Sequence, residues 1–140
     1  MNPLFKISRK CRRVINQAVA YEFPEVAPGW IKYARNPVLQ DNEGSIFDPY
    51  VRLVENRYIM CVSQRKNHSL AFYESSNGIE WNESSTVLEG LSGSTWEEKV
   101  NRASFLQREG RWYLWYTGQS DNRSAIGLAI SKDGFKFKRM

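Results

Sequence analysis

Asp48 and Arg102 are the charged residues whose spacing in the sequence could support chemistry. They occupy matching places in a pattern that occurs twice in the chain, with an offset of 54 residues (102 − 48). An arginine beside a carboxylate stabilises its ionised form, which is the form that a general base or a nucleophile uses. We therefore expect Asp48 and Arg102 to approach each other at one end of their strands, with Asn101 and Glu98 lining the same hollow.

Each of these residues also has a purely structural interpretation. An Asp-Pro pair such as Asp48-Pro49 is frequent in turns, and Arg102 could form a structural salt bridge with Asp48 or Glu98. Glu97 and Glu98 stand just before the second strand of interest, where we expect one to be solvated and the other to point inward. His68 is the single histidine, and neither a Cys/His cluster with metal-ligand spacing nor a Gly-rich phosphate loop is present, so we expect no metal and no cofactor.

The elements that must position these residues are repeated strands. Residues 47–81 and 101–137 show the same order of short apolar segments and turns. Arg57 matches Arg111 with an offset of 54 (111 − 57), and Gly78 matches Gly134 with an offset of 56 (134 − 78). A repeat of this length, built from short strands, is typical of β-propeller blades. We therefore predict an all-β fold made of two propeller blades.

The turn residues divide each blade into four strands. The first blade should contain strands over 48–54, 57–63, 69–75 and a short one near 79–81, and the second should contain strands over 102–107, 111–117, 125–131 and 135–139. Glu55-Asn56 should form one tight turn. Asn77-Gly78 indicates a type I′ hairpin turn, in which both central residues have positive φ, and Glu109-Gly110 and Asp133-Gly134 should be its counterparts.

The first part of the chain differs from this repeat. We expect a basic N-terminal helix and an irregular lead-in over residues 1–35, followed by two blades at about 36–84 and 85–140. Within the first part, apolar residues at three- and four-residue spacing predict an amphipathic helix over 3–20. That helix could pack on the body or attach the chain to a membrane surface or an acidic partner, and its role stays open.

Charge and hydropathy narrow the classes of partner. The net charge is +5, but residues 1–20 hold five basic residues and no acid, so the other 120 residues carry 15 charges of each sign. That balance argues against nucleic-acid binding by the repeated body. No apolar run approaches the roughly 20 residues of a membrane span, and no apolar stretch typical of a signal peptide follows the basic N-terminus. We expect a cytoplasmic protein for which membrane association is not favoured.

The segment 44–139 resembles the first two blades of the five-bladed propeller glycoside hydrolases, of the arabinanase and β-xylosidase type (family 43) and the invertase type (family 32). The resemblance rests on the segments Phe47–Val51, Trp96–Arg102 and Trp112–Gly118, and on two copies of Ser-x-(Asn/Asp)-Gly. It implies that Asp48 lies at the bottom of a funnel on the propeller axis and serves as nucleophile or general base. It also implies a carbohydrate as partner, with Arg102, Asn101, Trp96 and Glu97 as candidate substrate-binding residues.

The chain departs from the family pattern at the second carboxyl group. Glycoside hydrolysis uses two carboxyl groups, one ionised and one protonated. In these families a further Asp lies in the second blade and the acid Glu lies in the third, whereas here Arg102 and Asn101 stand in the second blade and no third blade is seen. Glu98 is the nearest candidate for the acid, beside Glu97. We expect the chain alone to hydrolyse glycosides weakly or not at all.

Three functions remain open at this point: a glycoside hydrolase or its N-terminal part, a carbohydrate-binding propeller segment without activity, and a protein-interaction scaffold. A closed propeller needs at least about four blades. The two blades therefore predict either further blades or self-association of the chain. The sugar, the linkage and the stereochemical outcome stay undecided.

Overall fold

The computed structural model describes residues 25–26, 30–41, 45–121 and 123–140. The helix expected over 3–20 lies outside these ranges. Contacts divide the chain into two compact units after Val38, three residues later than expected. In the first unit, β1 (Glu25–Val26) pairs in antiparallel fashion with β2 (Trp30–Ile31).

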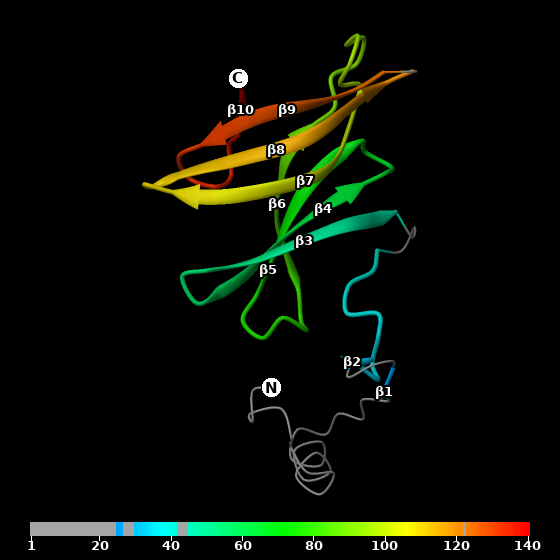
Figure 1. Ribbon diagram of the computed structural model, residues 1–140, viewed down its shortest axis with the longest axis vertical. Helices are drawn as coiled ribbons and strands as arrows, with labels where there is room; N and C mark the ends of the chain where they lie inside the picture. Colours follow the sequence, from blue (N-terminus) through cyan, green and yellow to red (C-terminus); the bar gives the residue numbers. More distant parts are fainter. Residues whose placement is uncertain (1–24, 27–29, 42–44, 122) are drawn as a thin grey trace, which may run out of the picture. The chain divides into compact units, whose positions relative to one another are not determined.

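The second unit contains two four-stranded antiparallel sheets. Figure 1 shows the first in green and the second in yellow to red. The first sheet has the order β3-β4-β5-β6: β3 (Ile46–Val54), β4 (Arg57–Gln64), β5 (Ser69–Ser75) and β6 (Asn82–Glu89). The second has the order β7-β8-β9-β10: β7 (Lys99–Arg108), β8 (Arg111–Ser120), β9 (Arg123–Ser131) and β10 (Lys138–Arg139). Each sheet is an up-and-down meander, the topology of a propeller blade.

The all-β prediction is confirmed for the described residues, and two strand predictions were wrong. The fourth strand of the first sheet is β6, not the segment 79–81, which belongs to the turn before it. The first sheet therefore extends to Glu89 and passes the division expected between residues 84 and 85. The fourth strand of the second sheet, β10, is confined to Lys138–Arg139, while Phe135 lies in the preceding turn.

Two of the predicted tight turns have the backbone that a type I′ turn requires. Glu55 and Asn56 have φ values of 47° and 66°, and Glu109 and Gly110 have 52° and 70°. Positive φ at both central residues matches the right-handed twist of the paired strands. These turns join the first two strands of each sheet, β3 to β4 and β7 to β8.

The turns at Gly78 and Gly134 are of a different kind from the one predicted. Gly78 has positive φ, but Asn77 is not among the residues with positive φ. The Asn77 Oδ1 atom instead accepts hydrogen bonds from the backbone N–H groups of Ile79 and Glu80, at 2.9 Å each. The Ser75 hydroxyl oxygen accepts the N–H of Gly78 at 2.9 Å. The side chains of the Ser-x-Asn-Gly motif therefore close this turn.

The second copy of the motif uses the same bonds with Asp133 in place of Asn77. Asp133 Oδ1 accepts the N–H groups of Phe135 and Lys136 at 2.9 Å each, and Ser131 Oγ accepts the N–H of Gly134 at 3.0 Å. These backbone hydrogen bonds lower the pKa of Asp133 to about 2, because they stabilise its ionised form. The turn geometry thus repeats with the sequence, and the two copies share a side-chain oxygen acceptor two residues after a serine.

The main core lies between the two sheets. Phe72 and Phe105 are packed with ring centroids 4.9 Å apart, and Tyr50 meets Phe105 edge-on at 5.5 Å. Leu70 and Leu114 are fully buried in the same cluster. A second, smaller cluster covers the other face of the first sheet, formed by Met60, Val62, Ala71 and Tyr73 with Leu39, Ile46 and Trp81 packed against it. The first sheet therefore has an apolar cluster on each face, although Val51 and Leu53 of β3 are 45% and 60% exposed.

The second sheet has one covered face and one open face. Tyr113 and Trp115 stack on the side opposite the core, with centroids 6.1 Å apart, and Trp115 is 39% exposed. Ile126, across the sheet from Thr117, is 71% exposed. With the offset of 54 (115 − 61), Trp115 corresponds to Cys61, which faces the second sheet from the first. The face of the second sheet that carries Tyr113, Trp115 and Ile126 thus matches the face by which the first sheet packs on the second. We call it the open face of the second sheet.

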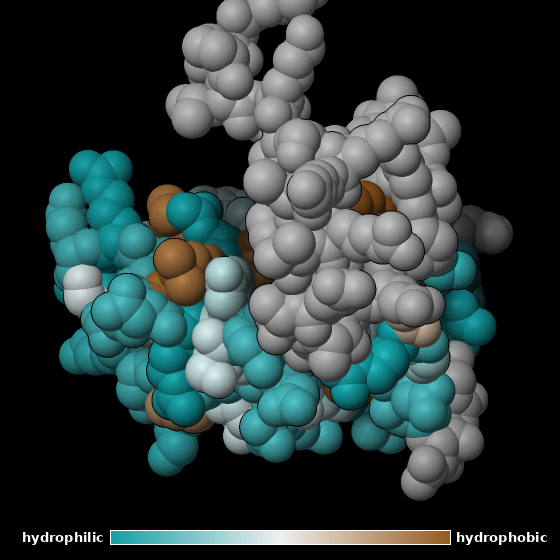
Figure 2. Space-filling view, turned by 90° about the horizontal axis from the view of Figure 1, so that it is seen from below, coloured by the Kyte–Doolittle hydropathy of each residue, from teal (hydrophilic) through white to brown (hydrophobic). Residues whose placement is uncertain are grey.

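Figure 2 shows one side of the molecule, on which a few hydrophobic residues lie among hydrophilic ones. The part of the chain that the structure describes includes no helix long and apolar enough to cross a membrane.

Candidate functional site

Asp48 and Arg102 each lie in a bulge of the first strand of their sheet, β3 and β7. The pairing of β3 with β4 shifts register between Phe47 and Tyr50, and that of β7 with β8 shifts between Asn101 and Ser104. Asp48 has a φ of 52° and Arg102 a φ of 51°, both in the left-handed region. Non-glycine residues rarely adopt this region, and bulges redirect side chains near functional sites. The repeat thus places the same unusual backbone at both positions.

The two side chains meet, as the sequence predicted. Arg102 Nε lies 3.6 Å from Asp48 Oδ2, and the Asp48 and Arg102 side chains are 34% and 61% exposed. Asp48 Oδ2 is itself buried and has no hydrogen-bond partner among the described residues. Buried polar oxygens are normally hydrogen-bonded. The pair therefore offers an acceptor oxygen and a cationic donor side by side.

Ser63 holds the Arg102 bulge in place. Its hydroxyl oxygen accepts the backbone N–H of Arg102 at 2.9 Å, which links β4 of the first sheet to β7 of the second. Ser63 is 1% exposed. Sequence reasoning missed this positioning residue, although one indication was present: Thr117, also a hydroxyl residue, stands at the matching place in the repeat (117 − 63 gives 54).

Asn101 lies one residue before Arg102 and is buried. Its Nδ2 atom donates to Gln119 Oε1 at 2.6 Å. Its Oδ1 atom is buried and has no hydrogen-bond partner in the described part of the chain. Asn101 Oδ1 and Asp48 Oδ2 are thus two buried oxygens without a donor among the described residues, which is unusual for buried polar atoms.

The structure does not place Glu98 with this pair. Its carboxylate accepts hydrogen bonds from the Gly93 N–H and the Ser120 hydroxyl, at 3.2 Å each. It lines a separate hollow beside Asn67 and His68. Four residues of extended chain separate it from Arg102, a distance of about 13 Å along the strand. The shared hollow expected for Glu98 is therefore not seen.

Glu97 is part of a buried network inside the second sheet. It is 5% exposed, accepts the Tyr116 hydroxyl at 2.7 Å and pairs with Arg139 Nε at 2.9 Å. Burial and then the hydrogen bond and charge of Glu97 raise the pKa of Tyr116 to about 12. The expectation that one glutamate of the Glu97-Glu98 pair points inward is confirmed. This network occupies Glu97 and does not leave its carboxylate free to contact a substrate.

Trp96 packs on the same network. Its ring is stacked on Tyr116 with centroids 6.1 Å apart. A Cβ atom at Gly118 or Gly127 would come within 2.7 Å or 2.8 Å of the Trp96 ring, so both glycines leave room for it. Trp96 is only partly exposed and belongs to the edge of the main core. Its position is that of a packing residue rather than a platform that stands free for a sugar.

Other kinds of site have little support in the described ranges. No group of three or more His, Cys, Asp or Glu residues that could hold a metal ion occurs there. Cys61 is a buried free thiol, and burial raises its pKa to about 12. A thiol with such a pKa stays protonated at neutral pH and is a poor nucleophile.

Comparison with solved structures places the fold among propeller glycoside hydrolases. A family 43 β-xylosidase/α-arabinofuranosidase from a compost microbial metagenome is 13% identical, with a TM-score of 0.57 over 69% of this chain and 34% of that one. The α-L-arabinanase of Cellvibrio cellulosa is 16% identical, with a TM-score of 0.55 over 68% of this chain and 34% of that one. The exo-β-1,3-galactanase of Phanerochaete chrysosporium is 16% identical, with a TM-score of 0.57 over 74% and 28%. The chain therefore spans about a third of the length of these structures.

Comparison at the level of sequence is consistent with this fold. None of the curated proteins is significantly similar in sequence. The model of the glycosyl hydrolases family 32 N-terminal domain matches residues 6–101, which include Asp48, Asn101 and the whole first sheet. This match covers more than half of the chain, and the chain belongs to the family of glycosyl hydrolases family 32 N-terminal domains.

Proposed function

We propose that the Asp48–Arg102 pair binds a carbohydrate and is one half of a glycoside hydrolase centre. The observation that carries the proposal is the pair of matched bulges, which bring an unbonded Asp48 oxygen next to the Arg102 guanidinium at 3.6 Å. Membership of a glycosyl hydrolase family supports a carbohydrate as the ligand.

The donors and acceptors of the pair suit adjacent sugar hydroxyls. A hydroxyl group both donates and accepts hydrogen bonds. The Asp48 side chain is 34% exposed, so the accessible part of its carboxylate can accept from one hydroxyl, and the 61% exposed Arg102 side chain can donate to its neighbour. Asn101, next to Arg102 in the sequence, is buried rather than facing solvent. The groups of Asp48 and Arg102 can orient a sugar without requiring a metal ion.

For hydrolysis, Asp48 would act as the general base or the nucleophile. Both the inverting and the retaining mechanism also need a protonated carboxyl group within about 5–10 Å. Glu97 is held by Arg139 and Tyr116, and Glu98 by Ser120 and Gly93. We infer that neither supplies the acid, and that this chain on its own binds sugars without efficient turnover.

The open face of the second sheet supports a further proposal about partners. Trp115 and Ile126 of the second sheet are exposed, whereas the residues at the matching positions of the first sheet are buried against the second sheet. Burying this apolar surface on another sheet is favourable. We propose that the face is covered by a further blade or by a second copy of the chain, and that a scaffold function is the alternative if no sugar binds.

Turnover of aryl glycosides tests the catalytic part of this proposal. The panel contains aryl arabinofuranosides, xylosides and fructosides, and compares the wild-type chain with Asp48→Asn. Asparagine has nearly the shape of aspartate and tolerates positive φ, so this variant removes the charge and preserves the bulge. We expect turnover near the detection limit for both proteins. Robust turnover by the wild type that disappears in Asp48→Asn would show that the chain supplies both carboxyl groups.

A further inference from the structure

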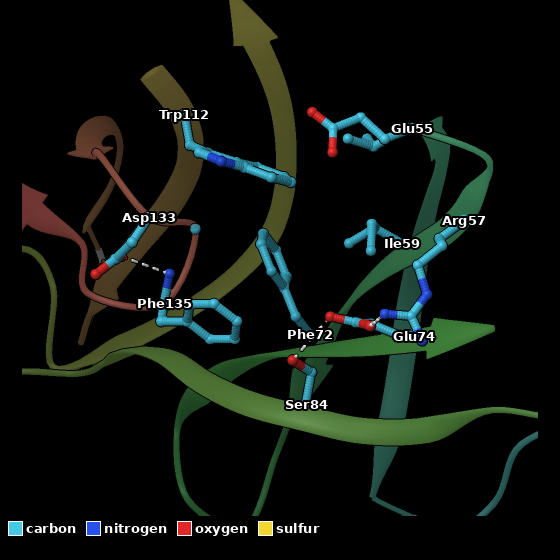
Figure 3. A pocket seen from close by; sticks show the side chains of 11 residues that line it. Glu55, Arg57, Ile59, Phe72, Glu74, Ser84, Trp112, Asp133 and Phe135 are labelled. Atoms are coloured by element: carbon cyan, nitrogen blue, oxygen red, sulfur yellow. Dashed lines mark hydrogen bonds and ion pairs between the residues drawn. The ribbon is translucent and has the colours of Figure 1, made fainter. Parts of the chain in front are cut away.

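A second hollow lies between the two sheets at the end away from Asp48. It measures about 200 Å³ and is lined chiefly by Val54, Glu55, Ile59, Phe72, Trp112 and Phe135. Val54 is six residues further along β3 than Asp48, which corresponds to about 20 Å of extended strand. Figure 3 shows the aromatic side chains gathered around this space, with Glu55 on the side of the β3–β4 turn. The hollow is therefore separate from the proposed carbohydrate site.

Three aromatic rings from different elements line the hollow. Phe72 of β5 and Trp112 of β8 have centroids 6.0 Å apart. A Cβ atom at Gly134 would lie 3.0 Å from the Trp112 ring, so the turn backbone packs closely on this ring and restricts it. Phe135, in the same turn, is 52% exposed. Phe72 is buried in the core and Trp112 is packed at its edge, so two of the three rings are held in place before any ligand arrives.

The charges around the hollow are negative on balance. Glu74 is neutralised by Arg57 at 2.9 Å and also accepts the Ser84 hydroxyl at 3.2 Å. By contrast, no hydrogen bond or ion pair of the Glu55 side chain occurs among the described residues. Asp133 also lines the hollow and keeps its charge at neutral pH, since the turn N–H groups lower its pKa to about 2. The carboxylate of Asp133 is bonded within its turn, so Glu55 is the carboxylate that leaves the hollow with negative charge unpaired among the described residues.

We propose that this hollow binds the methylated ammonium group of a small organic cation, with Trp112, Phe72 and Phe135 contacting the methyl groups and Glu55 balancing the charge. A cation close to aromatic faces is attracted by the ring quadrupoles, and quaternary ammonium ligands are recognised in this way. A primary ammonium has three donors to satisfy, whereas Glu55 is the one carboxylate lining the hollow whose oxygens accept no described hydrogen bond. A methylated ammonium needs no such partners and fits the apolar walls.

Three small probes of related structure test this assignment. Choline carries the trimethylammonium group, 3,3-dimethylbutan-1-ol is its uncharged analogue, and ethanolamine is the primary-ammonium analogue. Calorimetric titration gives each affinity, and the indole N–H signals in ¹H–¹⁵N NMR report contact with Trp112. Choline should bind at least about fivefold more tightly than either analogue, as expected for one desolvated cation–aromatic contact. Equal binding of the uncharged alcohol, equal binding of ethanolamine, or no binding of choline would each overturn the proposal.

Two variants and a matched control locate the site. Glu55→Gln and Phe135→Leu should each weaken choline binding severalfold, and both residues are exposed enough for the fold to tolerate the change. Glu109 occupies the matching turn position in the second sheet (109 − 55 gives 54), so Glu109→Gln should leave the affinity unchanged. An equal loss in Glu109→Gln would assign the effect to general surface charge and contradict the site. Because the hollow is distant from Asp48, oligosaccharides should not compete with choline, and this result is independent of the carbohydrate proposal.

Discussion

The strained backbone at Arg102 leads to a prediction in which glycine is more stable than alanine. Arg102 has a φ of 51° inside a strand, and a residue with a side chain pays about 1–2 kcal/mol for this left-handed conformation. Arg102→Gly removes that cost, whereas Arg102→Ala keeps it. Both variants keep the backbone N–H that donates to Ser63, and both lose the ion pair with Asp48.

The expected difference follows from three terms. Loss of the Arg102–Asp48 pair costs about 0–1 kcal/mol in either variant, since the Arg102 side chain is largely solvent-exposed. Glycine loses about 0.5–1 kcal/mol more backbone entropy on folding than alanine. Subtracting this from the relieved strain leaves Arg102→Gly more stable than Arg102→Ala by about 0.75 kcal/mol, within a range of roughly 0–1.5 kcal/mol.

Urea unfolding of both variants measures this difference. The matched control is Arg52, an exposed strand residue of β3 that is not among the residues with positive φ. At Arg52 the order should be reversed, with glycine less stable than alanine by about 0.5–1 kcal/mol. If the glycine variant is less stable than the alanine variant at both positions, the bulge stores no strain and the reasoning is refuted.

Three further predictions concern the buried network and the open face. Glu97→Ala should lower the free energy of unfolding by about 2 kcal/mol, as measured in urea, because the Tyr116 hydroxyl loses its acceptor and Arg139 keeps, among the described residues, only its bond to the Glu89 carbonyl; a loss below about 0.5 kcal/mol would show that the network is not buried in solution. Alkaline pH should destabilise the fold, because burial raises the pKa of Tyr116 and of Cys61 to about 12. The folded state binds these protons more tightly than the unfolded state, so their contribution is complete below about pH 9 and is lost as the pH rises toward 12; an unfolding free energy that stays constant over this range would contradict the prediction. Trp115→Ser should reduce self-association of the chain in light scattering, while Leu91→Ser, which changes an exposed loop residue, should not; an equal effect of both would argue against the open face.

The repeat made the contact between Asp48 and Arg102 predictable. The offset of 54 residues aligns Asp48 with Arg102, and equivalent residues of neighbouring blades converge, so their contact could be expected without a structure. Six of the eight strands were also located, because alternating apolar residues and glycine-containing turns bound them. The bulges themselves were not foreseen, since nothing in the types of Asp48 and Arg102 reveals a positive φ.

The errors have identifiable physical causes. The strand β6 was misplaced because the residues from 85 onward were assigned to the second blade, whereas Val87 and Leu88 complete the first sheet and are buried in the main core. The Asn77-Gly78 turn was assigned as type I′ because the dipeptide alone suggests it, whereas Ser75 two residues earlier supplies the acceptor that selects the other geometry. The role of Glu97 depends on Arg139, which is 42 residues away in the sequence, and such a partner cannot be identified from local pattern.

Calorimetric titration of the chain with arabino-, xylo- and fructo-oligosaccharides tests the central claim, that Asp48 and Arg102 form a carbohydrate site. The account predicts measurable binding of at least one of these sugars by the wild type. Asp48→Asn and Arg102→Ala should each weaken it about tenfold or more, the effect of losing a hydrogen bond to a charged group, while Arg52→Ala should bind as the wild type does. Binding that is unchanged in both Asp48→Asn and Arg102→Ala, or no binding by the folded wild type at millimolar sugar, would contradict the claim.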